Sequence, residues 1–130
     1  MKKTTSSTMR QLGSLELKVM RVVWAKGTAT VADVHEELRA KGDRLAYTTI
    51  LTTMSKLEKK GFLEHETIDR AYHYKALVSD EGVRTTYLTD LIEKFFNGSP
   101  GMLVNHLLDS ENLTDGELKK IREAIDEAKS

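Results

Sequence analysis

A hydroxyl-rich segment that ends in lysines is the stretch of this sequence best suited to contacting another molecule. Within residues 46–60, Ile50, Met54 and Leu57 recur at helical spacing and predict an inward helix face. The remaining face consists of Tyr47, Thr48, Thr49, Leu51, Thr52, Thr53, Ser55 and Lys56. Threonine is a weak helix former because its branched Cβ restricts its rotamers, but its hydroxyl can bond a phosphate or a base edge and its methyl can contact that of thymine. This face indicates either DNA recognition or a solvated surface that happens to be rich in threonine.

Basic residues stand where they would flank such a face. Lys56, Lys59 and Lys60 lie toward the C-terminus of the predicted helix, where they favour the helix dipole and can reach phosphates. Arg70 lies in the short polar turn 68–70 between two predicted strands, and the sequence leaves the type of this turn open. A basic residue on a short wing can enter a minor groove that A·T-rich sequence has narrowed.

The four histidines give little support to catalysis. No pair has the i, i+4 helical spacing of a metal site, and no HExxH or DxD pattern occurs. His65 and His73 are expected to meet across the hairpin on one face, where two imidazoles without a third ligand make an incomplete zinc site. No glycine-rich loop follows a predicted strand, as a phosphate cradle requires. We therefore expect no metal, no cofactor and no enzymatic activity; a small hydrolase that uses His65 and His73 is the weaker alternative.

The composition is that of an ordinary globular chain of 130 residues without cysteine, which excludes disulfides, thiolate metal sites and cysteine nucleophiles. Residues 1–11 lack periodicity and are expected to form a disordered arm. The longest apolar run, residues 22–25, is far shorter than the roughly 18 residues of a membrane span, so we expect a cytoplasmic protein without membrane contact. The net charge is zero, but residues 1–78 carry 14 Lys and Arg against 9 Asp and Glu, whereas residues 79–130 carry 6 against 11. The basic half is the part expected to face a polyanion.

Three short helices are predicted in the basic half. Ser14 offers an N-cap for the first helix. The pattern Thr30-x-x-Asp33 is a capping box for the second helix, which ends at Gly42. The threonine-rich segment forms the third helix and ends at Gly61.

A hairpin is predicted to follow these helices. Residues 62–67 and 71–78 form its strands, because Tyr72 and Tyr74 alternate with polar residues. Three helices and a hairpin in this order predict a winged helix–turn–helix DNA-binding domain over residues 12–78. The predicted fold class is mainly α with a small β-hairpin wing, followed by a C-terminal helical domain.

Residues 79–130 predict three further helices, the first capped by Ser79 or Asp80 and the last opened by the capping box Thr114-x-x-Glu117. The first of these helices carries two adjacent apolar stripes, and three such helices make no comfortable core alone. A second copy that presents the same surface is the simplest partner, so we expect a homodimer and a helical dimerisation domain. Its expected contact residues are Leu88, Leu91, Phe95, Leu103, Leu107, Leu118, Ile121 and Ile125. The alternative is that these helices fold back on the winged domain.

Several segments of the sequence together resemble a known family. They are LGSLELKVMRVVW, TVADVHEEL, LAYTTILTTMSKLEKKG and DRAYHY, with LTDGELKKIREAIDE near the end. They are similar to the penicillinase-repressor family, the BlaI/MecI group of bacterial winged-helix regulators, over residues 12–128. The resemblance implies a homodimeric repressor that binds double-stranded DNA at a palindromic operator, an inverted repeat of the TACA/TGTA type, with the last helices of the two chains interlocked.

The resemblance also implies roles for individual residues. The DNA-binding residues are Tyr47, Thr48, Thr49, Leu51, Thr52, Lys56 and Arg70. Among them the three threonines face base edges, Leu51 is placed to contact a thymine methyl, Lys56 reaches the backbone and Arg70 stands on the wing.

In the β-lactam-resistance branch of this family, induction is proteolysis of the dimerisation region, triggered by a membrane sensor and its linked protease. In this chain that region corresponds to residues 103–108, where Asn105, His106 and Leu107 stand in place of the family's Asn–Phe-type bond. The copper-responsive branch carries a cysteine-rich motif, which this chain cannot supply. The resemblance therefore leaves the inducing signal open.

Winged helices also serve as protein–protein docking modules in transcription machinery, and the neutral net charge fits that alternative. Salt separates the two hypotheses. Phosphate contacts make affinity fall steeply with ionic strength, whereas a mostly apolar docking surface does not have this dependence.

Overall fold

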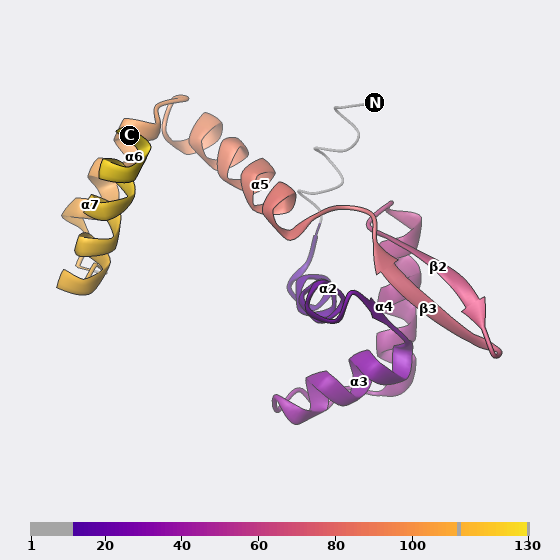
Figure 1. Ribbon diagram of the computed structural model, residues 1–130. Coiled ribbons are helices and arrows are strands. Elements are labelled where there is room, and N and C mark those ends of the chain that lie inside the picture. Colours follow the sequence, from indigo (N-terminus) through magenta and orange to yellow (C-terminus); the bar gives the residue numbers. More distant parts are fainter. Residues whose placement is uncertain (1–11, 112, 130) are drawn as a thin grey trace. The chain divides into compact units, whose positions relative to one another are not determined.

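The computed structural model describes residues 12–111 and 113–129, and the arm expected at residues 1–11 lies outside them. The described chain divides into two compact units, residues 12–87 and residues 88–129. The first unit contains α2 (Ser14–Lys26), α3 (Val31–Ala40), α4 (Tyr47–Lys59), β2 (Leu63–Ile68) and β3 (Ala71–Ala76) (Figure 1). This is the predicted order of three helices and a hairpin, so the winged helix–turn–helix is confirmed.

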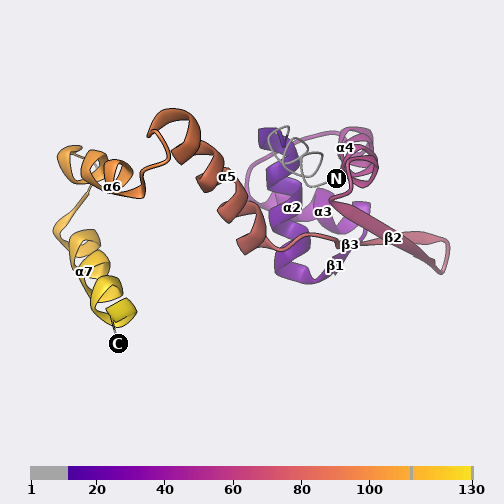
Figure 2. The ribbon, with the colours of Figure 1, turned by 90° about the horizontal axis from the view of Figure 1, so that it is seen from above.

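The sequence does not predict β1 (Thr28–Ala29), a short strand between α2 and α3. It pairs antiparallel with β3, Thr28 opposite Lys75 and Ala29 opposite Tyr74, and gives the described sheet the order β1-β3-β2. A strand of two residues is too short to produce an alternating pattern. It holds the base of the hairpin beside the helices, while the tip of the hairpin projects away from them (Figure 2).

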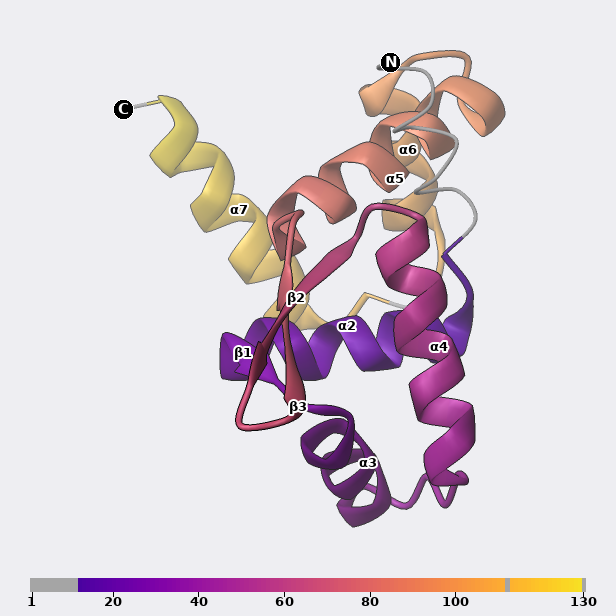
Figure 3. The same cartoon turned by 90° about the vertical axis from the view of Figure 1, so that its right-hand side faces the viewer.

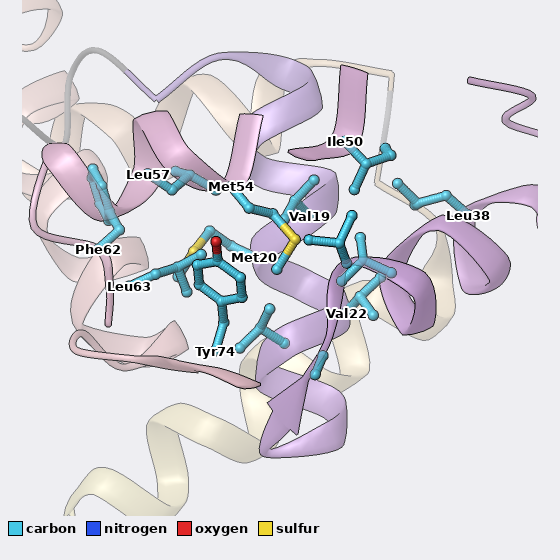
Figure 4. Packing of buried hydrophobic residues seen from close by; sticks show 14 of the residues in the cluster. Val19, Met20, Val22, Leu38, Ile50, Met54, Leu57, Phe62, Leu63 and Tyr74 are labelled. Carbon is cyan, nitrogen blue, oxygen red and sulfur yellow. The ribbon is translucent and has the colours of Figure 1, made fainter. Parts of the chain in front are cut away.

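The core of the first unit lies between the three helices and the base of the sheet (Figure 4). Ile50, Met54 and Leu57, predicted to point inward, are fully buried. Tyr74 points from β3 into the same cluster, and burial, with the nearby charge of Glu58, raises the pKa of its hydroxyl. The other buried hydrophobic residues are Val19, Met20, Val22, Val23, Ala29, Val31, Val34, Leu38, Phe62, Leu63 and Val83. The inner face of α4 is therefore fixed over its whole length.

The predicted cap of the first helix is wrong by one residue. Gly13, not Ser14, is the N-cap of α2. Glycine has no side chain that could cap the helix, and the Gly13 amide donates to Glu16 Oε1 at 2.7 Å. At α3 the capping box is confirmed. The Asp33 amide donates to Thr30 Oγ1 and the Thr30 amide donates to Asp33 Oδ2, both at 3.0 Å. The bond from the Thr30 amide holds the pKa of Asp33 below its ordinary value.

The hairpin turn has an unusual backbone for its residue types. Ile68 pairs with Ala71, so the loop consists of Asp69 and Arg70 alone, with φ of 51° and 69°. Positive φ at both positions is the pattern of a type I′ turn, which fits the twist of the flanking strands and normally takes Asn or Gly. A residue with a Cβ is unfavourable at such a φ, so the stability of the turn does not explain why an arginine stands at this tip.

The remaining chain is helical: α5 (Asp80–Phe95), α6 (Pro100–Asp109) and α7 (Asp115–Lys129). The first two turns of α5 pack on the first unit, where Val83 joins the core and the Tyr87 hydroxyl accepts a hydrogen bond from the Leu12 amide at 3.2 Å. Trp24 Nε1 donates to the Val78 carbonyl at 2.9 Å and fixes the chain just before α5. The compact units thus divide within α5, whereas the expected domain boundary at 78/79 lies at its start.

The predicted starts of α5 and α7 both have side-chain caps. Ser79 Oγ accepts from the Gly82 amide at 2.9 Å, and Thr114 Oγ1 accepts from the Glu117 amide at 3.2 Å. None of the described helices combines the length and the apolar character that crossing a membrane requires.

Candidate nucleic-acid interface

The outward face of α4 is a strip of exposed hydroxyl and apolar side chains. Every residue of this helix that was predicted to bind DNA is exposed: Tyr47, Thr48, Thr49, Leu51, Thr52 and Lys56. Their shared exposure follows from the burial of Ile50, Met54 and Leu57 on the opposite side. Figure 3 shows α4 at one edge of the first unit, and the exposure of these side chains leaves the strip accessible to a large partner.

Thr53 does not belong to this strip, although the sequence placed it on the outward face. Its side chain is only 8% exposed, and its hydroxyl donates to the Thr49 carbonyl at 2.8 Å. Threonine in a helix commonly bonds the carbonyl four residues earlier, which satisfies the hydroxyl without an outside partner. The exposed threonines of α4 are therefore Thr48, Thr49 and Thr52.

The N-terminal end of the strip is held by a histidine. His35 Nε2 donates to the Leu45 carbonyl at 2.9 Å, just before α4 begins. The ring of Tyr47 meets the His35 imidazole edge-on, with centroids 5.7 Å apart. Tyr47 is thus oriented by α3, which the sequence alone did not indicate.

The three lysines near the end of α4 have different surroundings. Lys60 Nζ donates to both oxygens of Glu16, at 2.8 and 2.9 Å, and so links α4 to the first turn of α2. Burial raises the pKa of Glu16, but the Gly13 amide and the Lys60 ammonium outweigh it and leave the pKa below its ordinary value. Lys56 and Lys59 are exposed and line a hollow beside the start of α2. They are the lysines of this helix that are best placed to meet phosphates.

The wing contacts α4 through its inner face. His65 Nδ1 on β2 lies 2.7 and 2.9 Å from the two carboxylate oxygens of Glu58 on α4. The His65 ring stacks on Tyr72 of β3, with centroids 3.8 Å apart and planes 11° apart. At the end of the wing, Arg70 is exposed together with Ile68. The wing and the helix therefore form one connected surface.

The expectation that His65 and His73 share one face of the hairpin is wrong. His65 stands opposite Tyr74, and His73 stands opposite Glu66. Residues that are directly opposite in an antiparallel pair share a face, so neighbouring positions of the register place the two imidazoles on opposite faces. In the part of the chain that the structure describes, no three His, Asp or Glu side chains are grouped to hold a metal ion.

The second unit presents a wide apolar surface. No residue of α6 or α7, both of which are described in full, is buried. Of the residues expected at a dimer contact, Leu88, Leu91, Phe95, Leu107 and Ile125 are exposed, and Leu103, Leu118 and Ile121 are partly buried. Phe95 reaches 72% exposure, and Met102, Val104 and Leu108 enlarge the surface. So many exposed large hydrophobic residues in one small unit are typical of a contact with another macromolecule.

The residues of the expected cleavage region lie inside a helix. Asn105, His106 and Leu107 are exposed residues of α6. The His106 ring meets Phe96 edge-on, with centroids 5.8 Å apart. These three residues are therefore accessible at the surface but have a regular helical backbone.

Comparison with known proteins gives one consistent result. Residues 12–127 match the family model described as penicillinase repressor. The methicillin resistance regulatory protein MecI of Mammaliicoccus sciuri is 26% identical over 115 residues, which cover 88% of this chain and 93% of that protein. The transcriptional regulator BlaI of Mycobacterium tuberculosis is 33% identical over 121 residues, which cover 92% of this chain and 86% of that protein.

Solved structures agree with these relatives. The solution structure of the DNA-binding domain of the repressor BlaI matches with 30% identity and a TM-score of 0.50, over 55% of this chain and 87% of that one. The complex structure of hsRosR-S4 matches with a TM-score of 0.59 over 95% of this chain and 96% of that one. Its identity is 15%, so this second likeness concerns the fold alone.

Proposed function

This chain belongs to the penicillinase repressor family, whose members are transcriptional repressors and not enzymes, and we propose that it is a homodimer that represses transcription at an inverted-repeat operator. One observation carries the proposal: the exposed strip of α4, fixed from behind by the core and flanked by basic residues. Double-stranded DNA offers the partner chemistry that such a strip fits, since it has base edges in the major groove and phosphates on both sides.

Each part of the surface has a separate role in this proposal. Thr48, Thr49 and Thr52 read base edges, because a short hydroxyl side chain lets the helix approach the groove closely. Leu51 contacts a thymine methyl, and Tyr47 lies at the end of the strip where the helix enters the groove. Lys56 bonds to the phosphate backbone and Arg70 enters the neighbouring minor groove.

The proposed homodimer explains how a small reading surface becomes selective. One winged domain contacts one half-site, and a second domain held by the same dimer binds the other half-site as an intramolecular event. The exposed apolar residues of the second unit, Phe95 and Leu107 among them, support a second copy as the partner that covers them. An inverted-repeat operator has the two-fold symmetry that such a dimer requires.

We propose that the inducing signal releases the operator by weakening the dimer, and that it leaves α4 unchanged. If the inducing signal is cleavage by a sensor-linked protease near Asn105, His106 and Leu107, α6 must first open, because proteases cleave chain that has locally unfolded. Loss of that helix removes apolar contact area while it leaves the winged domain intact. Affinity for the operator then falls because the two half-sites are no longer bound by one molecule.

The test is a titration of fluorescent duplexes with the full chain at two salt concentrations. A duplex with an inverted TACA/TGTA-type repeat is compared with a scrambled duplex of the same composition. Preference for the repeat, two chains per duplex and a steep loss of affinity with salt are the expected results. Equal weak binding to both duplexes contradicts the operator class. Absence of binding even at low salt contradicts DNA binding and favours the docking module in transcription machinery.

A further inference from the structure

The inner face of the wing holds a tyrosine whose ring is fixed while its hydroxyl is open. Tyr72 stacks on His65 and meets Tyr74 edge-on, with centroids 6.1 Å apart. Its side chain is nevertheless 48% exposed. The Tyr74 hydroxyl bonds with Ser55 and the Tyr87 hydroxyl bonds with the Leu12 amide, whereas the Tyr72 hydroxyl has no hydrogen-bond partner among the described residues.

The position of Tyr72 relative to α4 follows from two contacts. Ser55 and Glu58 lie four and seven residues after Leu51, so the three residues share one edge of the helix. Ser55 bonds with Tyr74 and Glu58 bonds with His65, so the inner face of the wing borders this edge. A duplex seated on the exposed strip of α4 would therefore also face the wing at this edge.

His65 is the residue that fixes the ring. Its Nδ1 donates to the Glu58 carboxylate, which sets the plane of the imidazole. The nearly parallel stack then sets the plane of the Tyr72 ring. The buried Tyr74 ring also packs against the His65 imidazole and restricts it further. A preorganised donor loses little conformational freedom when it binds, so such an arrangement favours contact with a partner.

We propose that the Tyr72 hydroxyl donates a hydrogen bond to a phosphate of the operator backbone, and that His65, held by Glu58, is the positioning residue for it. This inference rests on the proposed function, because it names a further contact of the same DNA interface. A tyrosine is a neutral donor, so the contact adds affinity without the release of a counterion and without reading sequence.

The first experiment compares the full chain with Tyr72→Phe, which keeps the stacked ring and removes only the hydroxyl. We expect the Kd to rise about three- to tenfold on both the repeat and the scrambled duplex. The slope of affinity against salt concentration stays the same, which separates this loss from that of a lysine or arginine contact. His73→Ala is the matched control, since His73 follows Tyr72 on β3 and lies on the other face, and its Kd stays at the wild-type value.

The second experiment tests the positioning role by a double-mutant cycle. His65→Ala is expected to weaken DNA binding as much as Tyr72→Phe does. In the Tyr72→Phe background, His65→Ala is expected to have no further effect on the Kd, because no hydroxyl is left to position. A role in fold stability alone would weaken binding equally in both backgrounds.

The outcomes separate the two proposals. Failure of the wild-type chain to bind any duplex overturns the proposed function itself. Wild-type binding together with an unchanged Kd for Tyr72→Phe overturns the tyrosine contact and leaves the proposed function standing. Additive losses in the cycle overturn the positioning role of His65.

Discussion

Lys60, at the C-terminal end of α4, bonds to Glu16, in the first turn of α2, through both carboxylate oxygens at 2.8 and 2.9 Å. The same carboxylate accepts a hydrogen bond from the Gly13 amide, so one side chain both caps α2 and ties α4 to it. The Lys60 side chain is 25% exposed and that of Glu16 is 12% exposed, which limits screening by water. This lysine therefore holds α4 in place, and Lys56 and Lys59 are left for contact with phosphates.

Glu16→Gln should lower the free energy of unfolding at pH 7 by about 1–2 kcal/mol, because it removes a charge-assisted pair in a partly buried place. The pKa of Glu16 is depressed in the folded chain, so its contribution is present above the unfolded pKa of about 4.5 and is lost as pH falls through the lower folded pKa. Denaturation at pH 7 and in the acid range measures both effects. The difference between the wild type and the variant should shrink below pH 4.5. Glu37→Gln, at an exposed and longer ion pair with Lys41, is the control with little change at either pH.

Lys56→Ala should weaken binding to the repeat and to the scrambled duplex by similar factors, about fivefold each, since a phosphate contact carries no sequence information. The slope of log affinity against log salt should fall by about 1, one released counterion fewer. Fluorescence anisotropy at several salt concentrations measures both quantities. Lys119→Ala, at an exposed position of α7, should leave the slope unchanged. A selective loss on the repeat alone would contradict the phosphate contact of Lys56.

Thr49→Ala should relax the preference for one base pair of each half-site by about 1 kcal/mol, because the hydroxyl and methyl that touch the base edge are lost. Binding to a set of duplexes with single base-pair changes measures this preference. Thr53→Ala is the matched control four residues along the same helix. Its hydroxyl is engaged by the Thr49 carbonyl, so the variant should lose stability while its base preferences stay the same. If Thr49→Ala lowered the affinity for every duplex equally, Thr49 would not contact a base edge.

The elements that could be predicted from the sequence are those defined by local pattern. Ile50, Met54 and Leu57 recur at helical spacing, and this alone orients the exposed strip of α4. The sequence wrongly predicts Thr53 on the exposed face of α4 because Thr53 lies at the margin of the buried face. Its burial depends on the neighbouring start of α2, which the helical spacing does not show. The strand β1 depends on a partner far along the chain. The register between β2 and β3 could not be predicted either. A shift of this register by one residue changes whether His65 and His73 share a face of the hairpin.

Arg70→Gly should separate the stability of the wing from its function. Arg70 has φ of 69°, a conformation that glycine adopts without strain, so the variant should be more stable by about 0.5–1 kcal/mol. Its affinity for the repeat should fall, because the basic side chain at the wing tip is gone. Urea denaturation and the duplex titration measure the two effects in one preparation. Arg70→Lys keeps both the charge and the unfavourable φ, so it should change neither quantity much. A variant that gains stability and binds as tightly as the wild type would show that the wing tip makes no contact.

Ile125→Asp tests the homodimer at a residue whose side chain is half-exposed in the single chain. A charge at an exposed helix position disturbs the fold of one chain little, so a large effect must come from a partner that buries this position. We expect the dissociation constant of the dimer to rise at least about tenfold and the affinity for the two-half-site repeat to fall with it. Sedimentation equilibrium measures the first quantity. Lys119→Asp introduces the same side chain on the polar side of α7 and should leave the dimer intact. If Ile125→Asp remains a dimer with wild-type affinity, α7 does not pack against a second copy through this residue, and the apolar surface of the second unit serves another partner.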